Sequence, residues 1–341
     1  MYSLTLDGSG TTVQGRAGQS VLDAFLASGV AMPYNCRSGE CGECVARLVS
    51  GQVHELPGAD PATYTDAMRA EGRILTCMCY PRSDIAISVP LRDHAPPRIR
   101  DFDAVIERVA WHGERTAQVV VRCPQAIEFC AGQYFEWWAP GAQTPRSYSA
   151  SSAPGSDRLE FLVRIYPGGQ ISERLTRREL AAGDVLTLHG PFGTYEFTMA
   201  DSLPAIFVAG GTGIAPAKSI VAAALAANCA RPLHVFHGAR DSSELQCSRD
   251  LEVLAKQHPQ LRFVPVLSDE PVESDWTGAR GTVVDALAAG LGDAFGAEAY
   301  LCGPPAMIDK AVCVLERRGV MRSDIYCDKF VPALEAAAPS S

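Results

Sequence analysis

The cysteines suggest the first chemistry in this chain, which contains 12 of them. Cys36, Cys41 and Cys44 lie in one short segment with C-x4-C-x2-C spacing, and Cys77 and Cys79 follow further along the chain. Three clustered thiolates and a distant fourth are typical of the ligands of a [2Fe-2S] cluster. On spacing alone, the fourth ligand is either Cys77 or Cys79.

Two glycines inside the cysteine segment favour a tight loop around iron. Gly39 and Gly42 tolerate positive φ angles and let backbone amides approach the sulfides. The alternatives are a structural zinc site or inert core cysteines, but zinc sites usually show two separated, closely spaced cysteine pairs. Five other cysteines show no such grouping and are predicted to pack in the core: Cys123, Cys130, Cys229, Cys247 and Cys313.

A second set of residues suits a flavin. Arg146-Ser-Tyr148-Ser149 offers a guanidinium for a pyrophosphate, a phenol ring to stack on the isoalloxazine, and a hydroxyl for its N5 atom. The alternative is an ordinary edge strand. Gly169 lies in a glycine turn that opens a helix predicted from Ser172 to Leu180, where unpaired amides would attract a phosphate. Ser172 is alternatively only a helix cap.

A third set of residues suits a nicotinamide nucleotide. Gly210-Gly211-Thr212-Gly213 follows an apolar strand and precedes a helix, so glycine backbone and helix start would meet a phosphate together. The turn departs from G-x-G-x-x-G because Pro216 takes the last position. Cys302 follows another strand and precedes another helix, which places it at the same rim of a parallel sheet. It either contacts the nicotinamide ring or only packs.

The elements that must position these residues fall into three domains. Residues 1–95 read as a small α+β domain with a helix from Val21 to Gly29, in which Ser20 and Asp23 have capping-box spacing. A proline-containing linker begins at Arg92. Residues 96–202 show the short strands of an antiparallel β-barrel, and residues 203–333 alternate strands and helices as in a doubly wound α/β domain. Residues 334–341 are predicted to form a flexible tail.

Composition excludes several classes of protein. The 341 residues are 47% hydrophobic and 20% charged, which indicates a folded chain rather than a disordered one. A net charge of −9 argues against a nucleic-acid partner. No apolar run reaches the roughly 18 residues of a membrane span, and no basic and apolar leader follows Met1. We therefore expect a cytoplasmic protein without a membrane partner, whose cysteines form no structural disulfides.

Taken in order, these motifs resemble the ferredoxin-NAD(P)+ reductase superfamily with an N-terminal plant-type ferredoxin domain, a resemblance that covers about residues 1–333. It resembles the reductase components of bacterial oxygenases most. The resemblance implies FAD as the flavin and Cys77 as the fourth iron ligand, because Leu75-Thr76-Cys77 matches the family's fourth-ligand segment. The residues implied to bind FAD are Arg146, Tyr148, Ser149, Gly169 and Ser172. Those implied to face the nicotinamide nucleotide are Gly211, Thr212, Gly213 and Cys302.

Two further expectations concern the flavin face and the nucleotide. The resemblance implies that Phe330 covers the flavin face opposite Tyr148; the alternative is a core residue of a final strand. A 2′-phosphate needs a basic partner, whereas the segment containing Asp269 and Glu270 would repel it, so NADH is preferred. Arg240 keeps NADPH open.

The expected activity is electron transfer. NADH would reduce FAD by hydride transfer, with Ser149 and Cys302 as catalytic residues, and electrons would leave singly through the cluster. The seven histidines show no oxygen-activating grouping, so a partner is expected, a terminal oxygenase of the Rieske or di-iron type acting on an aromatic or other hydrocarbon. The alternatives are a reductase for a deoxysugar dehydratase of the CDP-6-deoxy-glucoseen type and, in another class, a non-catalytic electron carrier or redox sensor.

Overall fold

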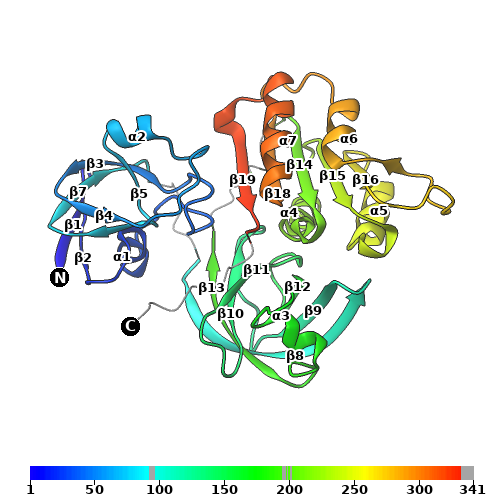
Figure 1. Ribbon diagram of the computed structural model, residues 1–341, viewed down its shortest axis with the longest axis horizontal. Helices are drawn as coiled ribbons and strands as arrows, with labels where there is room; N and C mark the ends of the chain where they lie inside the picture. The colour runs from blue at the N-terminus through cyan, green and yellow to red at the C-terminus, as the bar shows by residue number, and fades with distance from the viewer. Residues whose placement is uncertain (92–96, 194–196, 198, 200–201, 332–341) are drawn as a thin grey trace. The chain divides into compact units, whose positions relative to one another are not determined.

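A computed structural model of the chain describes residues 1–91, 97–193, 197, 199 and 202–331 (Figure 1). The expected tail and most of the expected linker lie outside these residues. The chain divides into two compact units. One holds the residues up to Arg100 and a short stretch that begins at Gly190, and the other holds Asp101–His189 and the residues from Phe197 onward.

The first unit has the predicted α+β architecture. Its five-stranded sheet has the order β2-β1-β7-β3-β5, with β1 and β7 parallel and the other pairs antiparallel. Helix α1 begins after Ser20, whose hydroxyl accepts a hydrogen bond from the Asp23 N–H, as the capping spacing predicts. The helix ends at Ala27, two residues before the predicted end, and Gly29 follows with φ +77°. The elements are β1 (Tyr2–Leu6), β2 (Thr12–Gly15), α1 (Val21–Ala27), β3 (Val45–Ser50), β4 (Val53–Glu55), α2 (Asp66–Ala70), β5 (Arg73–Leu75), β6 (Cys79–Pro81) and β7 (Ile85–Ser88).

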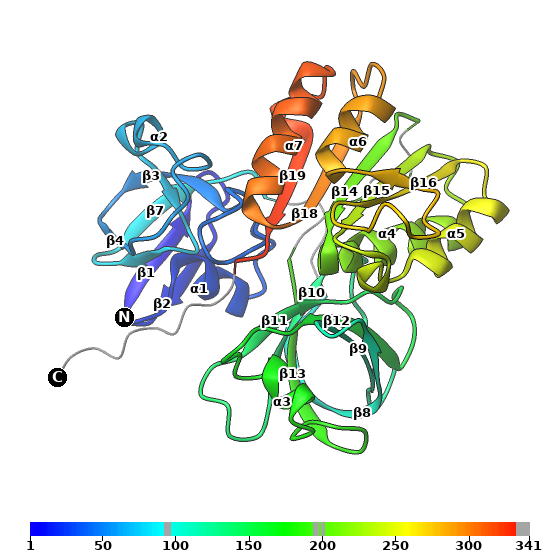
Figure 2. The same cartoon turned by 45° about the vertical axis from the view of Figure 1, so that its right-hand side comes forward.

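The second unit begins with a six-stranded sheet of order β11-β10-β13-β8-β9-β12. The pairs β10–β11, β8–β9 and β9–β12 are antiparallel. A bridge between Ala150, which follows β11, and Phe161 of β12 joins the two ends of the sheet into the predicted barrel (Figure 2). Its core is aromatic, with the rings of Trp137 and Phe161 perpendicular at 5.0 Å. The elements are β8 (Arg100–His112), β9 (Thr116–Arg122), β10 (Tyr134–Trp138), β11 (Arg146–Ser149), β12 (Arg158–Arg164), α3 (Ser172–Thr176) and β13 (Val185–Phe192).

The remaining sheet is parallel, with the order β17-β16-β15-β14-β18-β19. Strand β14 lies between β15 and β18 and is buried along nearly its whole length, as expected for a doubly wound sheet with helices on both faces. Helices α6 and α7 pack together against one face. The elements are β14 (Ala205–Gly210), η1 (Gly211–Gly213), α4 (Ile214–Ala226), β15 (Leu233–Ala239), η2 (Ser242–Glu244), α5 (Ser248–Gln257), β16 (Leu261–Leu267), β17 (Ala279–Arg280), α6 (Val283–Gly290), β18 (Glu298–Gly303), α7 (Pro305–Arg317), η3 (Arg322–Asp324) and β19 (Ile325–Lys329).

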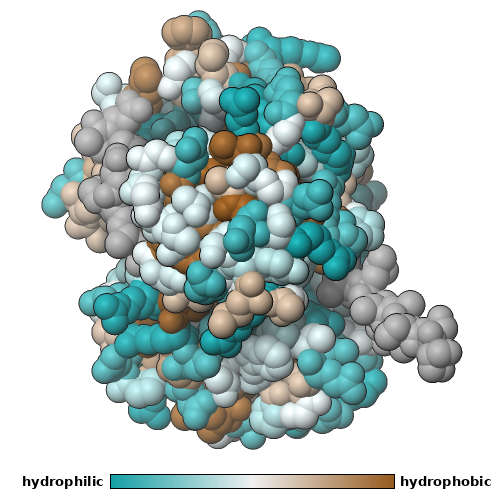
Figure 3. All heavy atoms as spheres, turned by 90° about the vertical axis from the view of Figure 1, so that its left-hand side faces the viewer, coloured by the Kyte–Doolittle hydropathy of each residue, from teal (hydrophilic) through white to brown (hydrophobic). Residues whose placement is uncertain are grey.

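Within the described residues, no helix has both the length and the apolar character needed to span a bilayer. On the face shown in Figure 3, hydrophilic side chains predominate around a smaller group of hydrophobic residues near the middle.

Candidate functional site

The four cysteines predicted to bind iron lie together in the first unit as two pairs. The backbone N–H of Cys36 is 3.5 Å from the Cys41 sulfur, and the sulfurs of Cys44 and Cys77 are 3.2 Å apart. Between α1 and β3 the loop folds back on itself as the sequence predicts, with Gly39 at φ +84° and Gly42 at φ +77°. A Cβ atom at Gly42 would lie 2.6 Å from Thr63, so the loop has no room for a side chain there.

This paired arrangement fits a cluster of two irons better than one metal ion. In the described part of the chain, no three His, Cys, Asp or Glu side chains converge as ligands of a single ion. A structural zinc site would need four ligands around one point, whereas a [2Fe-2S] cluster takes four thiolates shared between two irons. The geometry therefore favours the iron cluster over the zinc alternative.

Each pair contains one thiol whose pKa is lowered. A hydrogen bond from Cys41 lowers the pKa of Cys36 to about 5, against the opposing effect of burial. In the second pair, a hydrogen bond from Cys77 lowers the pKa of Cys44, and the same bond together with burial raises the pKa of Cys77. Because the thiolate is the form that binds metal, the lowered pKa of one thiol in each pair favours metal binding.

The start of α1 and the residue before Cys77 position the two pairs. The Leu22 N–H donates to the Thr76 carbonyl at 2.9 Å, and the Asp23 carboxylate binds Arg37 of the cysteine loop at 3.0 Å. The Thr76 hydroxyl and N–H in turn donate to the Cys44 carbonyl, at 3.0 and 3.1 Å. Sequence reasoning missed Thr76. Its only signal was its place beside the fourth ligand.

Cys79 belongs to neither pair. It begins β6, is fully buried, and is paired with Glu55 of β4 in the two-stranded sheet. Burial and the nearby Glu55 carboxylate raise the pKa of the Cys79 thiol to about 12. The sulfur that lies beside Cys44 is that of Cys77 and not that of Cys79, which favours Cys77 as the fourth ligand.

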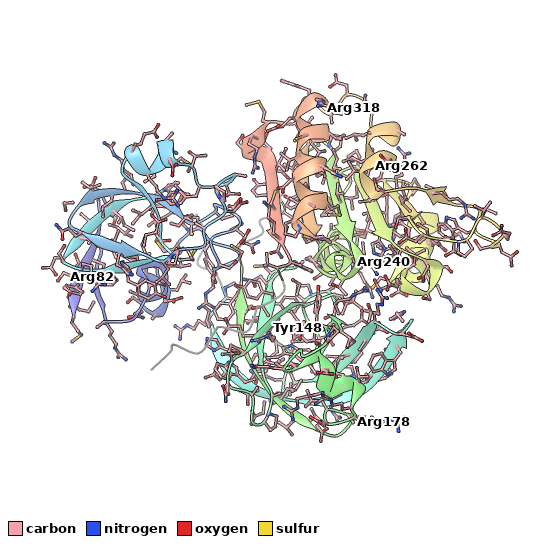
Figure 4. All side chains as sticks on the ribbon, viewed as in Figure 1. Arg82, Tyr148, Arg178, Arg240, Arg262 and Arg318 are labelled. Atoms are coloured by element: carbon pink, nitrogen blue, oxygen red, sulfur yellow. The ribbon has the colours of Figure 1, made fainter. Side chains whose placement is uncertain are left out.

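The residues expected to hold a flavin lie on β11 of the barrel. The Tyr148 ring packs against Trp137 with centroids 4.7 Å apart, and burial raises the pKa of its phenol. Arg146 donates to the Thr144 hydroxyl at 2.6 Å and to the Pro145 carbonyl at 2.8 Å. The Ser149 hydroxyl makes no hydrogen bond to any described residue and is therefore free to bind a ligand. Figure 4 places Tyr148 on the side of the barrel that faces the α/β domain.

The glycine turn before α3 differs from expectation. The helix ends at Thr176 rather than Leu180, and Ser172 does not cap it, because the helix begins at Ser172 and its hydroxyl accepts from Tyr166 at 3.3 Å. The amides of Gly168 and Gly169 already donate to the Glu173 carboxylate and to the Tyr166 carbonyl. The amides expected to be unpaired are thus occupied, since the turn is closed by its own residues.

The Gly169 position is nevertheless tightly defined. A Cβ atom there would lie 2.2 Å from the Ser172 hydroxyl and 2.9 Å from the Tyr166 carbonyl oxygen. A cavity of about 450 Å³ borders the turn, and Arg174 and Arg177 are among its lining residues. The turn therefore offers a shaped edge, and the two nearby guanidinium groups pair with the carboxylates of Glu179 and Glu173.

The nicotinamide candidates gather where β14 and β18 end. Ala209 is in register with Cys302, which is buried, and a Cβ atom at Gly213 would lie 2.1 Å from the Cys302 carbonyl oxygen. Thr212 lies between the glycines in η1. Pro216 is tolerated because it is the third residue of α4, where a backbone N–H has no partner within the helix.

His237 is a buried residue of this site that sequence reasoning missed. It lies in β15 in register with Ala209, and its Nε2 atom is 3.0 Å from the Gly211 carbonyl oxygen. Burial lowers the pKa of His237 to about 4, although the bond to Gly211 opposes this change. The neutral ring therefore donates from Nε2 and holds the glycine turn.

The last candidates lie at the same edge of the parallel sheet. Phe330 follows β19. Its N–H donates at 2.9 Å to the carbonyl of Gly303, the residue directly after Cys302. The Asp269 N–H donates to the Arg240 carbonyl at 2.8 Å, so the loops after β15 and β16 meet. In the same loops the Ser242 N–H donates to Glu270 at 2.8 Å, and this bond lowers the pKa of Glu270.

Comparison with protein families divides the chain in the order of its three sheets. Residues 4–82 match a 2Fe-2S iron-sulfur cluster binding domain, residues 107–197 an oxidoreductase FAD-binding domain, and residues 207–313 an oxidoreductase NAD-binding domain. These matches confirm the predicted fold class and the predicted cofactors.

Similar proteins share the full domain order. The phenol hydroxylase P5 protein of Acinetobacter pittii is 32% identical over 345 residues, covering 100% of this chain and 97% of that protein. The CDP-6-deoxy-L-threo-D-glycero-4-hexulose-3-dehydrase reductase of Yersinia pestis is 34% identical over 320 residues, covering 92% and 94%. The crystal structure of a cytochrome P450 reductase from Amycolatopsis superimposes with a TM-score of 0.84 at 33% identity, covering 97% of this chain and 99% of that one.

Proposed function

The chain belongs to the family of iron-sulfur flavoprotein NAD(P)H oxidoreductases in which a 2Fe-2S domain precedes FAD-binding and NAD-binding domains, and we propose that it is the NADH-dependent reductase component of a multicomponent oxygenase. Proteins of this family pass electrons from NAD(P)H through FAD and the cluster to an acceptor. The observation that carries the proposal is the arrangement of four cysteines in two pairs, Cys36 with Cys41 and Cys44 with Cys77. A [2Fe-2S] cluster held by these cysteines would pass electrons to an acceptor one at a time.

We propose that the cluster is held by Cys36, Cys41, Cys44 and Cys77. Arg146, Tyr148, Ser149, Gly169 and Ser172 hold FAD, and Gly211, Thr212, Gly213, Cys302 and Asp269 face the nicotinamide nucleotide, with Phe330 over the flavin. A bound flavin accepts two electrons as one hydride and passes them on singly. The Ser149 hydroxyl, which makes no hydrogen bond to a described residue, would donate to and orient the flavin N5 atom, and the neutral His237 holds the glycine turn at residues 210–213 in place.

The proposed acceptor is a terminal oxygenase of the Rieske or di-iron type that acts on an aromatic or other hydrocarbon. The phenol hydroxylase relative supports this choice. The deoxysugar dehydrase reductase favours a second candidate at almost the same identity, and the P450 reductase structure favours a third. Reconstitution of NADH-driven turnover with purified terminal components of each class separates them, and turnover only with the dehydrase or the P450 would contradict the oxygenase assignment.

The Cys77→Ser variant tests the electron path. We expect it to lose cytochrome c reduction and to retain NADH:ferricyanide reduction, because the flavin and nucleotide domains form a compact unit of their own. Cys79→Ser is the matched control and should keep both activities and the rhombic EPR signal of the reduced cluster. The opposite pattern would make Cys79 the ligand, and loss of ferricyanide reduction in Cys77→Ser would contradict the proposed order of transfer.

A further inference from the structure

Strand β12 carries two opposite charges toward the α/β domain. Residues 160 and 164 point to the same side of a strand because side chains alternate with a period of two. The Glu160 carboxylate binds the Lys218 ammonium of α4 at 2.8 Å, and the Arg164 guanidinium binds the Glu244 carboxylate of η2 at 3.1 Å. We call these four residues, Glu160, Arg164, Lys218 and Glu244, the interdomain brace.

The brace is shielded from solvent. The side chains of Lys218 and Glu160 are 12% and 18% exposed, and those of Arg164 and Glu244 are 21% and 10% exposed. Exposed ion pairs contribute little, but pairs with this degree of burial are screened less and fix geometry more strongly. Asp250 of α5 also binds Lys218 at 2.8 Å. Burial alone would lower the pKa of Lys218, but the neighbouring acidic groups raise it, so the ammonium stays charged.

Hydrogen bonds connect the brace to the two chain segments that are proposed to bind the flavin and the nicotinamide nucleotide. The Ser151 hydroxyl donates to the same Glu160 oxygen at 2.7 Å, and the Ser219 hydroxyl donates to the Ser152 carbonyl at 2.7 Å. Ser151 and Ser152 follow the strand that ends at Ser149 after one intervening residue, Ala150. Lys218 and Ser219 lie in α4, the helix that begins directly after the glycine turn at residues 210–213. In addition, β12 lies against that turn.

We propose that the four residues of the interdomain brace are positioning residues for hydride transfer, which hold the glycine turn at residues 210–213 in register with the strand that ends at Ser149. The proposal rests on the proposed function. In the transfer, the C4–H bond of NADH breaks, a flavin N5–H bond forms, and the hydride carries both electrons. The rate of such a step falls steeply when the donor and acceptor atoms are misplaced, by about 100-fold for about 1 Å.

The test compares Lys218→Met with Lys256→Met, a control at an exposed lysine of α5. We expect Lys218→Met to slow FAD reduction at saturating NADH by about tenfold in stopped-flow measurements and to enlarge the isotope effect with 4-deuterated NADH. The affinity for NADH and the reoxidation of dithionite-reduced protein by cytochrome c should change little. Hydrogen exchange at Ser151, Ser152 and the first turn of α4 should rise, which reports the brace without any turnover.

A charge exchange keeps the proposal testable if Lys218→Met disturbs folding. Arg164→Glu and Glu244→Arg should each slow FAD reduction and raise hydrogen exchange, and the double variant should recover most of both. Normal FAD reduction in Lys218→Met, or a double exchange no better than its single variants, would overturn the proposal. A wild-type protein whose FAD is not reduced by NADH would instead contradict the proposed function.

Discussion

At the scale of single residues, Asp269 tests the choice of nucleotide. The loops after β15 and β16 meet at Asp269, and Glu270 adds a second carboxylate there. In the proposed nucleotide pocket, these charges would repel a 2′-phosphate and suit a free 2′-hydroxyl. We expect Asp269→Arg to raise the ratio of kcat/KM for NADPH to that for NADH by about tenfold, or about 1.4 kcal/mol. The exposed Glu252→Arg should leave the ratio unchanged, and an unchanged ratio in both variants would refute the pocket.

His237 predicts a pH dependence of stability. Burial gives the folded protein a His237 pKa of about 4, compared with about 6.5 for an unfolded chain. Between these values only the unfolded chain takes up the proton, so stability falls as pH drops below 6.5 and the loss is complete below the folded pKa. The loss amounts to about 2 kcal/mol between pH 7 and pH 5.

Urea unfolding across this range measures the effect. His237→Gln keeps a donor for the Gly211 carbonyl and removes the titration, so its stability should fall less with acid. His54→Gln, at an exposed histidine, should behave as the wild type. If the free energy of unfolding of His237→Gln falls with acid as steeply as that of the wild type, the His237 ring is not the source of the pH dependence.

At the scale of elements, Gly213 sets the approach of η1 to β18. An added methyl group would lie 2.1 Å from the Cys302 carbonyl oxygen, a backbone atom that cannot rotate away. Gly213→Ala must therefore push the glycine turn at residues 210–213 away from β18. We expect this variant to have a lower Tm and to bind NADH at least about tenfold more weakly, as measured by titration. Gly292→Ala, where a Cβ atom meets open space, is the control. Equal affinity in the two variants would contradict the assignment of the turn.

The elements that the sequence predicts well are those with a strong pattern. The β/α alternation after residue 203 is regular, and the structure has the alternating strands and helices predicted for the last domain. The 13-residue β8 is hard to predict from its sequence, because its exposed and buried residues do not alternate cleanly and a bulge lies between Ile106 and Arg108. Helix α3 was predicted too long because Arg178 adopts a φ of +58°, which ends the helix early and which spacing does not reveal.

The candidate sites divide in the same way. Cysteine spacing finds three iron candidates and limits the fourth to Cys77 or Cys79, because the ligands themselves carry the chemistry, and the family resemblance then implies Cys77. Thr76, His237 and Lys218 were missed because each acts through a partner that is distant in the chain and adjacent only in the fold.

At the scale of the whole molecule, Arg231 joins three segments of the second unit. Its side chain is fully buried, pairs with Glu298 at the start of β18 at 2.7 Å, and donates to the Leu203 and Pro204 carbonyls just before β14. Removal of one partner leaves a buried charge uncompensated, so Arg231→Met should lower the free energy of unfolding by about 3–5 kcal/mol.

Chemical denaturation of this variant measures the loss. Arg317→Met, at an exposed residue, should leave the free energy of unfolding unchanged. Adding Glu298→Gln to Arg231→Met should restore part of the stability, because it removes the carboxylate that has lost its Arg231 partner. A double variant less stable than Arg231→Met would argue against a buried pair.

The double hold of Thr76 on Cys44 also bears on the metal ligands. Bringing two residues 33 positions apart together costs an otherwise free chain about 3 kcal/mol of entropy. Bonds between ordinary backbone and hydroxyl groups offset part of that cost, in addition to any bonds that Cys44 and Cys77 make to a metal. Removal of the metal should therefore leave the chain segments that carry these two cysteines side by side.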